Sequence, residues 1–208
     1  MKKKVLNLYA GIGGNRKLWT DCEVTAVEYN SDIAAIYKDF FPQDDVIVGD
    51  AHDYLLKHYK EFDFIWTSPP CPTHSRARFW GLNVGSYLPV YPDMKLWQEI
   101  IFLKHHATSK WVVENVTPYY QPLIEPQKIG RHLFWANFSV GDVKTPEFKK
   151  DSFEYLQKLH GFNIEKYKLK NRVQVLRNCV HPQIGEYVFN RAMGILSAEN
   201  TEQLKLAI

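Results

Sequence analysis

Cysteine is scarce in this sequence, and the spacings that would give it a structural role are missing. The three cysteines are Cys22, Cys71 and Cys179, and no two of them show the Cys-x-x-Cys spacing of a zinc site. Their number excludes a dense disulfide framework, and we expect no metal. No apolar run approaches the roughly 20 residues that a membrane span needs, so no membrane partner is expected. The apolar run 5–9 is too short for a signal-peptide core, which predicts a cytoplasmic protein.

A large excess of charge of one sign is also absent. The net charge of +3 is too small to indicate a polyanionic partner. Between Lys149 and Arg177, however, eight lysines and arginines stand against three acidic residues, and aromatic residues are interspersed. This pattern suits a phosphate backbone and exposed bases. A solvated surface with a few core aromatics explains it equally well.

The order of apolar segments predicts an α/β fold. The 208 residues, 45% of them hydrophobic, are enough for one sizeable core. Segments typical of buried strands alternate with helical ones, and we expect strands at 4–9, 23–28, 46–48, 62–67 and 111–113 and helices at 32–41, 53–59 and 95–106. Further on we expect a strand or hairpin at 131–138, a helix at 184–193 and an irregular basic segment between them. Strands spaced by helices imply a mostly parallel sheet covered on both faces. The long stretch between Cys71 and Lys95 is predicted to be a functional loop.

The segment Phe64-Ile65-Trp66-Thr67-Ser68-Pro69-Pro70-Cys71 is the most informative in the chain. An apolar run that ends in proline predicts a buried strand leading into a rigid loop. Cys71 is then held at the rim of a sheet, where ligands of open α/β folds bind. It is a candidate nucleophile, and the alternative is a small buried apolar side chain.

A glycine-rich turn after the first strand predicts a cofactor site. The sequence Gly11-Ile12-Gly13-Gly14 lets the backbone approach a ligand closely, and we expect a helix after it. It lacks the full G-x-G-x-x-G of dinucleotide sites and the Lys-Ser/Thr of a P-loop. Glu28 and Asp50 end the next two strands, where carboxylates accept from ribose hydroxyls or an adenine amino group. The alternatives are helix capping by Asp50 and simple surface exposure of Glu28.

A further carboxylate, Glu114, ends the strand after the one that leads to Cys71. In a site poor in water, a glutamate acts as an acid because burial raises its pKa. A capping or ion-pairing role is the alternative.

Together these motifs resemble the DNA cytosine-5 methyltransferase family. The resemblance rests on motifs that occur in the family's order and spans about 5–193. The residues that carry it are Tyr9-Ala10-Gly11-Ile12-Gly13-Gly14, Glu28, Asp50, Pro69-Pro70-Cys71, Glu114-Asn115-Val116, Gln127-x-x-x-Arg131 and Arg177-Asn178-Cys179-Val180. It implies a Rossmann-like S-adenosylmethionine-dependent fold with a small irregular subdomain. It also implies a monomer acting on double- or single-stranded DNA in a prokaryotic or phage-infected host cell.

The resemblance also implies a role for each residue. Cys71 adds to C6 of a flipped-out cytosine, and C5 then takes the methyl group of S-adenosylmethionine. Glu114 holds or protonates ring N3, Asn115 supports it, and Arg131 contacts O2, with Arg76 or Arg78 as further cations near the thiol. The implied cofactor contacts are Tyr9, Gly11, Gly13, Glu28, Asp50, Pro70 and Asn178.

The chain departs from the family pattern in two respects. Ile129 stands where the family's two-arginine motif carries its first arginine. The region for target recognition is short, which predicts a core at 1–138, a reduced basic subdomain at 139–175 and a returning segment at 176–208. We therefore expect short or relaxed sequence specificity. The alternatives are methylation of RNA cytosine and an inactive nucleic-acid-binding module of the same fold.

Overall fold

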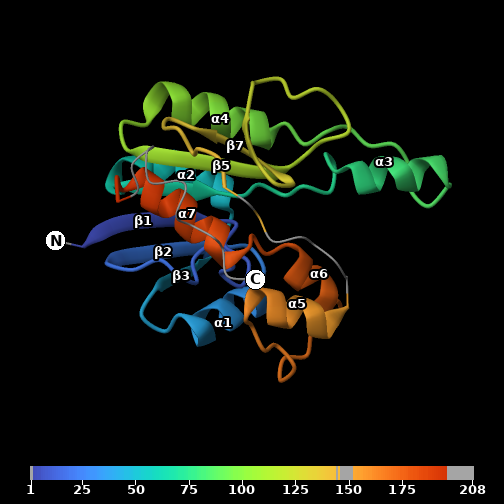
Figure 1. The fold of residues 1–208 in the computed structure, drawn as a ribbon, viewed down its shortest axis with the longest axis horizontal. Helices are drawn as coiled ribbons and strands as arrows, with labels where there is room; N and C mark the ends of the chain where they lie inside the picture. The colour runs from blue at the N-terminus through green and yellow to red at the C-terminus, as the bar shows by residue number, and fades with distance from the viewer. Residues whose placement is uncertain (1, 144, 146–151, 196–208) are drawn as a thin grey trace.

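The computed structural model describes residues 2–143, 145 and 152–195 (Figure 1). Its centre is a seven-stranded sheet in the order β3-β2-β1-β4-β5-β7-β6. The strands are β1 Lys3–Leu8, β2 Cys22–Glu28, β3 Asp45–Val48, β4 Phe64–Thr67, β5 Lys110–Val116, β6 Gln127–Ile129 and β7 His132–Ala136. The five strands from β3 to β5 are parallel, and β7 and β6 add as an antiparallel hairpin. The predicted mostly parallel α/β sheet is confirmed.

Eight helical segments surround this sheet in the part of the chain that the structure describes. They are α1 Ser31–Phe40, α2 Ala51–His58, the short 3₁₀ helix Tyr59–Glu61, α3 Arg76–Asn83, α4 Lys95–His106, α5 Phe153–His160, α6 Arg172–Arg177 and α7 Pro182–Ala192. The predicted helix at 95–106 agrees with α4 at both ends. Asn30 caps α1, because its Oδ1 accepts from the backbone N–H groups of Asp32 and Ile33.

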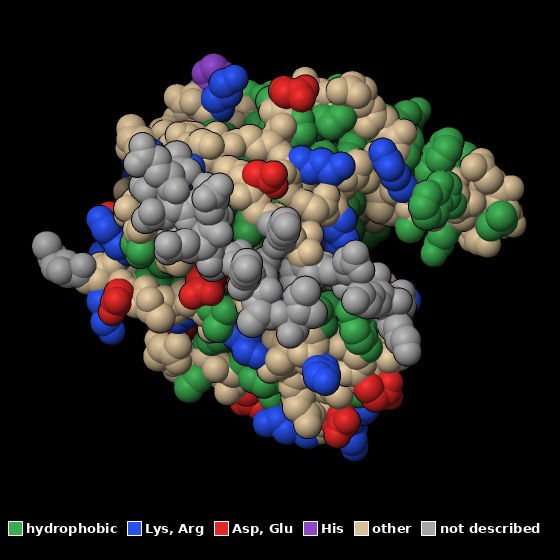
Figure 2. Space-filling model, viewed as in Figure 1, with side chains coloured by type: hydrophobic (Ala, Val, Ile, Leu, Met, Phe, Trp, Pro, Cys, Tyr) green, Lys and Arg blue, Asp and Glu red, His purple; other side chains and the backbone are tan. Residues whose placement is uncertain are grey.

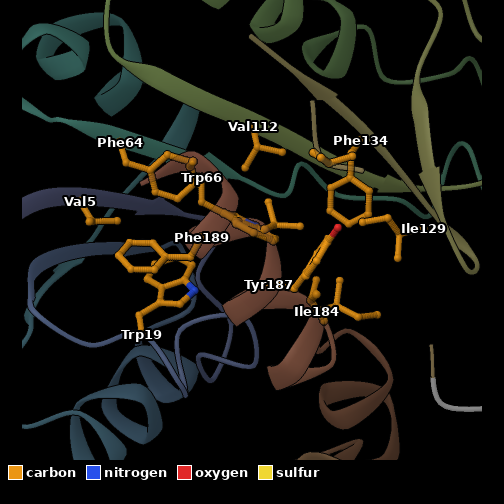
Figure 3. Packing of buried hydrophobic residues seen from close by; sticks show 14 of the residues in the cluster. Val5, Trp19, Phe64, Trp66, Val112, Ile129, Phe134, Ile184, Tyr187 and Phe189 are labelled. Carbon is orange, nitrogen blue, oxygen red and sulfur yellow. The ribbon is translucent and has the colours of Figure 1, made fainter. Parts of the chain in front are cut away.

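Alternate residues of the strands pack against different helices. On one face, Val5 and Phe64 join Trp19 and the α7 residues Tyr187 and Phe189 in one core cluster (Figure 3). On the other face, the neighbouring residues of β1 and β4 pack against α2 and α4. The strands are therefore buried on both faces, which explains why the sequence shows continuous apolar runs.

Helix α7 is locked against the loop that follows β1. The indole N–H of Trp19 donates to the carbonyl oxygen of Gly185 across 3.0 Å. A Cβ atom on Gly185 would lie 2.3 Å from the backbone oxygen of Asn15, so only glycine allows this approach. The last described helix thus supports the glycine-rich turn near the start of the chain.

Three sequence predictions about helices are wrong. The stretch after Cys71 contains α3, which begins where Ser75 Oγ accepts from the Arg78 N–H. The expected helix after the glycine-rich turn is a series of turns over 11–18. The basic segment is not irregular in its described part, because it forms α5 and α6. Four residues of the predicted basic, aromatic pattern lie outside the described residues: Phe148, Lys149, Lys150 and Asp151.

The aromatic residues of the basic segment contribute to the core. Phe162 is 2% exposed and packs against Phe40 and Phe41 of the α1 region. Leu156 of α5 and Tyr37 of α1 belong to the same core cluster. The described part of the segment is therefore packed onto the sheet domain. Among the described helices, none combines the length and the apolar character that crossing a bilayer requires.

Candidate active site

The site lies at the carboxyl ends of β1, β4 and β5. β1 pairs with β2 on one side and with β4 on the other, so the chain changes direction across the sheet at this point. Open α/β sheets bind ligands at such switch points. The glycine-rich turn follows β1, and the Cys71 loop follows β4.

Cys71 begins a tight turn directly after the two prolines. Its carbonyl oxygen accepts from the backbone N–H groups of His74 and Ser75 at 2.9 and 3.0 Å. The residue is partly exposed, and no disulfide engages it. Pro70 beside it is exposed, whereas Pro69 is buried. The turn presents the thiol at the rim of the sheet, as the sequence predicts.

Glu114 and Asn115 reach the same region from β5. Glu114 is 6% exposed and Asn115 is 2% exposed. The Asn115 side-chain Nδ2 donates to the carbonyl oxygen of Pro69 across 2.9 Å. This bond fixes the Cys71 loop against the strand that carries Glu114.

Arg131 completes the group from the turn between β6 and β7. Gly130 precedes it with φ of 58°, a left-handed conformation that lets the hairpin turn tightly. Burial raises the pKa of the Cys71 thiol, the negative charge of Glu114 raises it further, and the positive charge of Arg131 offsets part of the rise. The structure thus brings Cys71, Glu114 and Arg131 close enough for their charges to interact.

His132 belongs to this group, and sequence reasoning missed it. Its Nδ1 lies 2.5 Å from Glu114 Oε1, and Arg131 Nε donates to its Nε2 across 3.2 Å. It is 7% exposed. The signal in the sequence was its position next to Arg131 at the start of a strand whose residues alternate between the two faces.

The other two candidate arginines take different partners. Arg76 Nε donates to the carbonyl oxygen of Pro118, and Arg78 Nη2 donates to that of Leu88. The expectation that they act on the thiol gains no support from these contacts. Instead, they help to attach α3 and the loop after it.

The first half of the loop after Cys71 is fixed, and α3 projects from the body (Figure 1). Ser75 and Pro118 form an isolated antiparallel bridge, and the rings of Phe79 and Tyr119 stack with centroids 5.2 Å apart. Residues 76–94 form the α3 arm, and hydrophobic side chains gather on the projecting end of the molecule in Figure 2. The exposed large apolar side chains of the arm are Phe79, Trp80, Val84, Tyr87, Leu88, Val90, Tyr91 and Met94.

The glycine-rich turn is built for close backbone approach. Gly11 and Gly13 have φ of 55° and 86°, which favour glycine. A Cβ atom on Gly13 would lie 2.3 Å from the ring of Phe41. Glu28 is half-buried beside this turn, and its Oε2 accepts from the Gly11 N–H across 3.0 Å. Glu28 is therefore placed at the turn rather than on open surface.

Tyr9 and Asp50 are engaged with protein partners. The Tyr9 hydroxyl donates to Glu99 Oε1 at 2.5 Å, and burial followed by the charge of Glu99 raises its pKa. Asp50 Oδ1 accepts from two backbone N–H groups of α2, and its Oδ2 lies 3.3 Å from Lys95 Nζ. Asp50 thus caps a helix, which was the alternative interpretation of this residue.

Asn178 lies at the end of α6 and is exposed. Its Oδ1 accepts from Gln174 Nε2 across 2.7 Å. The next residue, Cys179, is buried against the glycine-rich turn, since a Cβ atom on Gly14 would lie 2.8 Å from its Cβ. The structure therefore brings the motif that contains Asn178 to the turn, with the Asn178 side chain on its outer side.

The described residues offer no set of side chains that could bind a metal ion. Within 2–143, 145 and 152–195, no group of three or more His, Cys, Asp and Glu side chains is arranged to hold a metal ion.

Comparison with known proteins identifies a family. The family described as C-5 cytosine-specific DNA methylase matches residues 3–117, which is more than half of the 208-residue chain. This match includes the glycine-rich turn, Cys71 and Glu114. No curated protein sequence matches the chain.

Several solved structures match part of the chain. A hypothetical protein of Thermus thermophilus is 17% identical over 65% of this chain and 74% of its own, with a TM-score of 0.41. An S-adenosylmethionine-dependent methyltransferase of Agrobacterium tumefaciens is 15% identical over 58% of this chain and 40% of its own, with a TM-score of 0.40. A DNMT2 mutant of Spodoptera frugiperda is 27% identical over 55% of this chain and 36% of its own, with a TM-score of 0.38. The matched region thus spans less than half of the last two proteins.

Proposed function

The chain belongs to the family of C-5 cytosine-specific DNA methylases, and we propose that it methylates C5 of cytosine in DNA through a covalent bond between Cys71 and C6. The family uses S-adenosylmethionine, which supplies an electrophilic methyl group when bound. One observation carries the proposal. The Cys71 loop is hydrogen-bonded to the strand that carries Glu114, through the Asn115 amide and the Pro69 carbonyl oxygen. Arg131 is joined to Glu114 through the ring of His132.

The chemistry requires this set of groups. Cytosine C6 is a poor electrophile until the negative charge that forms on the ring is neutralised. We assign Glu114 to ring N3 and Arg131 to O2, where a proton donor and a cation neutralise that charge. Asn115 acts on the loop rather than on the base, because its amide is bonded to Pro69.

In the proposed reaction, each bond that forms is matched by a bond that breaks. The Cys71 thiolate forms a C–S bond at C6, and the displaced electron pair makes C5 nucleophilic. C5 would take the methyl group of a bound donor, and the electron pair of the broken methyl–sulfur bond would stay on the donor sulfur. C5 then loses its proton to a base, and the C–S bond breaks as the ring double bond returns. The thiolate is regenerated, and the product is 5-methylcytosine.

The turn after β1 fits the cofactor. Gly11 and Gly13 remove side chains from its inner surface, and Glu28 offers a carboxylate suited to ribose hydroxyls. We place the adenine beside Asp50, whose Oδ2 would exchange Lys95 for the adenine amino group. Tyr9 then supports the turn through Glu99. Pro70 and Asn178 complete the proposed pocket.

The α3 arm suits contact with nucleic acid. Its exposed aromatic side chains offer stacking surfaces for unpaired bases. Reaction at C5 and C6 also requires that the base leave a duplex, at a few kcal/mol. We propose that the arm covers the extruded base, and that the short 139–175 region confers short or relaxed specificity. Within the proposed returning segment 176–208, the described helix α7 packs against the sheet core.

Covalent capture tests the proposal. Wild-type protein is incubated with S-adenosylmethionine and oligonucleotides that contain 5-fluorocytosine. Fluorine at C5 blocks the elimination, so the active protein stays bonded to DNA and shifts on a denaturing gel. The Cys71→Ala variant should bind S-adenosylmethionine and give no adduct. An adduct on RNA alone would replace the DNA substrate with RNA, and no adduct on either would indicate an inactive binding module.

A further inference from the structure

The imidazole of His132 lies between two residues of the proposed site. In the β5–β7 pair, His132 stands opposite Val116. It therefore shares a sheet face with Glu114, which lies two residues away on β5, at a diagonal position. One ring nitrogen meets Glu114 Oε1 at 2.5 Å and the other meets Arg131 Nε at 3.2 Å.

The two hydrogen bonds together fix the protonation state of His132. The Nε of arginine always carries a hydrogen, so it donates and His132 Nε2 accepts. The single proton of the neutral ring then lies on Nδ1. It is donated to Glu114 Oε1, which accepts whether or not Oε2 carries the proton assigned to ring N3. Only this tautomer satisfies both contacts.

We infer that His132 is a positioning residue for the methyl-transfer reaction, an inference that rests on the proposed function. Its N–H holds Oε1 of Glu114 and leaves Oε2 for the cytosine ring. Its other nitrogen holds the guanidinium of Arg131. One imidazole therefore sets the spacing between the groups assigned to N3 and O2.

This role offsets a departure in the sequence. Ile129 occupies the position of the first arginine in the family's motif, and its side chain is 0% exposed within the core. It offers no polar group to the site. A second arginine at position 129 would give polar support to the site. His132 gives this support from β7 instead.

Charged and titratable groups surround the pair from several elements. Cys71 lies on the loop after β4, and Arg131 lies on the β6–β7 turn. Arg131 and His132 also line a pocket together with the titratable residues His160, Cys179 and His181. Any pH profile of the site therefore has to be compared between variants rather than interpreted alone.

Two substitutions test the two ring nitrogens of His132 separately. His132→Asn keeps an N–H near the Nδ1 position and loses the acceptor toward Arg131. His132→Gln places its amide near the Nε2 position and loses the donor toward Glu114. We expect His132→Ala to lower kcat about 10- to 100-fold, because a hydrogen bond to a charged group is lost, with KM for S-adenosylmethionine unchanged. Asn should recover more activity than Gln.

A pH profile distinguishes positioning from mere packing. Without the Nδ1 donor the proposed site loses a hydrogen bond that holds Glu114 in place, so the pH–kcat profiles of His132→Ala and His132→Gln should differ from that of the wild type. Leu133→Ala is the matched control, since Leu133 is buried in β7 on the opposite face. It should lower the melting temperature and leave the profile in place.

The outcomes separate the two proposals. Absence of a wild-type adduct with 5-fluorocytosine rejects the proposed function. A normal wild-type adduct, with His132→Ala at wild-type kcat and an unchanged profile, rejects only the role of His132. If the alanine variant does not fold, equal activity of the asparagine and glutamine variants rejects it instead.

Discussion

The side-chain amide of Asn115 donates a hydrogen bond to the carbonyl oxygen of Pro69 across 2.9 Å. The two residues lie 46 positions apart in sequence. Their bond joins the loop that carries Cys71, the proposed nucleophile, to the strand that carries Glu114, the proposed acid. Since Asn115 is almost fully buried, this bond is not replaced by water when it is broken.

Asn115→Asp should slow adduct formation with 5-fluorocytosine. A carboxylate oxygen would face the Pro69 carbonyl oxygen, and the loop would shift away from Glu114. We expect a loss of about tenfold or more in rate, as for a small misplacement of reacting groups. Quench-flow gels measure the rate, and S-adenosylmethionine binding measured by calorimetry should stay at the wild-type value. An unchanged adduct rate would contradict the role assigned to this bond.

Alkylation of Cys71 should report the charges beside it. Burial and Glu114 raise the pKa of the thiol, so reaction with iodoacetamide should increase toward alkaline pH. Glu114→Gln removes a negative charge and should move the profile to lower pH, whereas Arg131→Gln should move it to higher pH. Mass spectrometry of the Cys71 peptide separates this signal from Cys22 and Cys179. Profiles that coincide would show that neither charge acts on the thiol.

His160 should make the protein less stable in acid. Burial, then His181 and Arg131, lowers the pKa of His160 to about 3, from 6.5 for an ordinary histidine. Between these values the unfolded chain binds the proton and the folded chain does not, so the free energy of unfolding falls as the pH drops from 6.5 toward 3. A single such group gives a slope of at most about 1.4 kcal/mol per pH unit.

The variant His160→Leu tests this origin. Leucine fills much of the space and does not titrate, so its free energy of unfolding should fall less steeply below pH 6.5 than that of the wild type. Urea melts at several pH values measure both slopes. The comparison between variants is needed because burial also lowers the pKa of His74 and His181. Parallel slopes would assign the acid sensitivity to other groups.

Trp80→Ala should weaken binding of single-stranded DNA. Trp80 is 65% exposed on the α3 arm, and loss of a stacking surface costs about 1–3 kcal/mol per base. Fluorescence anisotropy with a labelled oligonucleotide measures the affinity. Leu56→Ala is the control, because Leu56 is 60% exposed on α2 outside the arm. Equal affinities of the two variants would remove the arm from the proposed interface.

The strands and the long helices could be predicted because their signals are local. The run 62–67 is apolar enough to predict β4, and α1 follows Asn30, a typical N-cap residue. The helix α3 was missed because it projects from the body. Only Gly81 of its residues is buried, so no apolar stripe marks it in the sequence. Its start depends on one serine cap.

The residues around the proposed chemistry were only partly predictable. Cys71 follows β4 and Glu114 lies near the end of β5, and strand ends are found from sequence. His132 was missed because its partner lies on a strand 18 residues earlier, and pairing register is not a local property. Glu99 was missed for the same reason. It accepts from Tyr9 and Thr67, although it lies in the middle of an otherwise apolar helix face.

The contact of Gly185 with Asn15 has a consequence for synthesis and folding. The contact joins parts of the chain 170 residues apart, since 185 minus 15 is 170. Until α7 has left the ribosome, Trp19 lacks both its hydrogen-bond partner and the Phe189 ring stacked on it at 5.1 Å. The glycine-rich turn is therefore completed late, as expected for folds rich in non-local contacts. Affinity for the methyl donor should appear only after translation has passed α7, so a nascent chain would not take up the cofactor early.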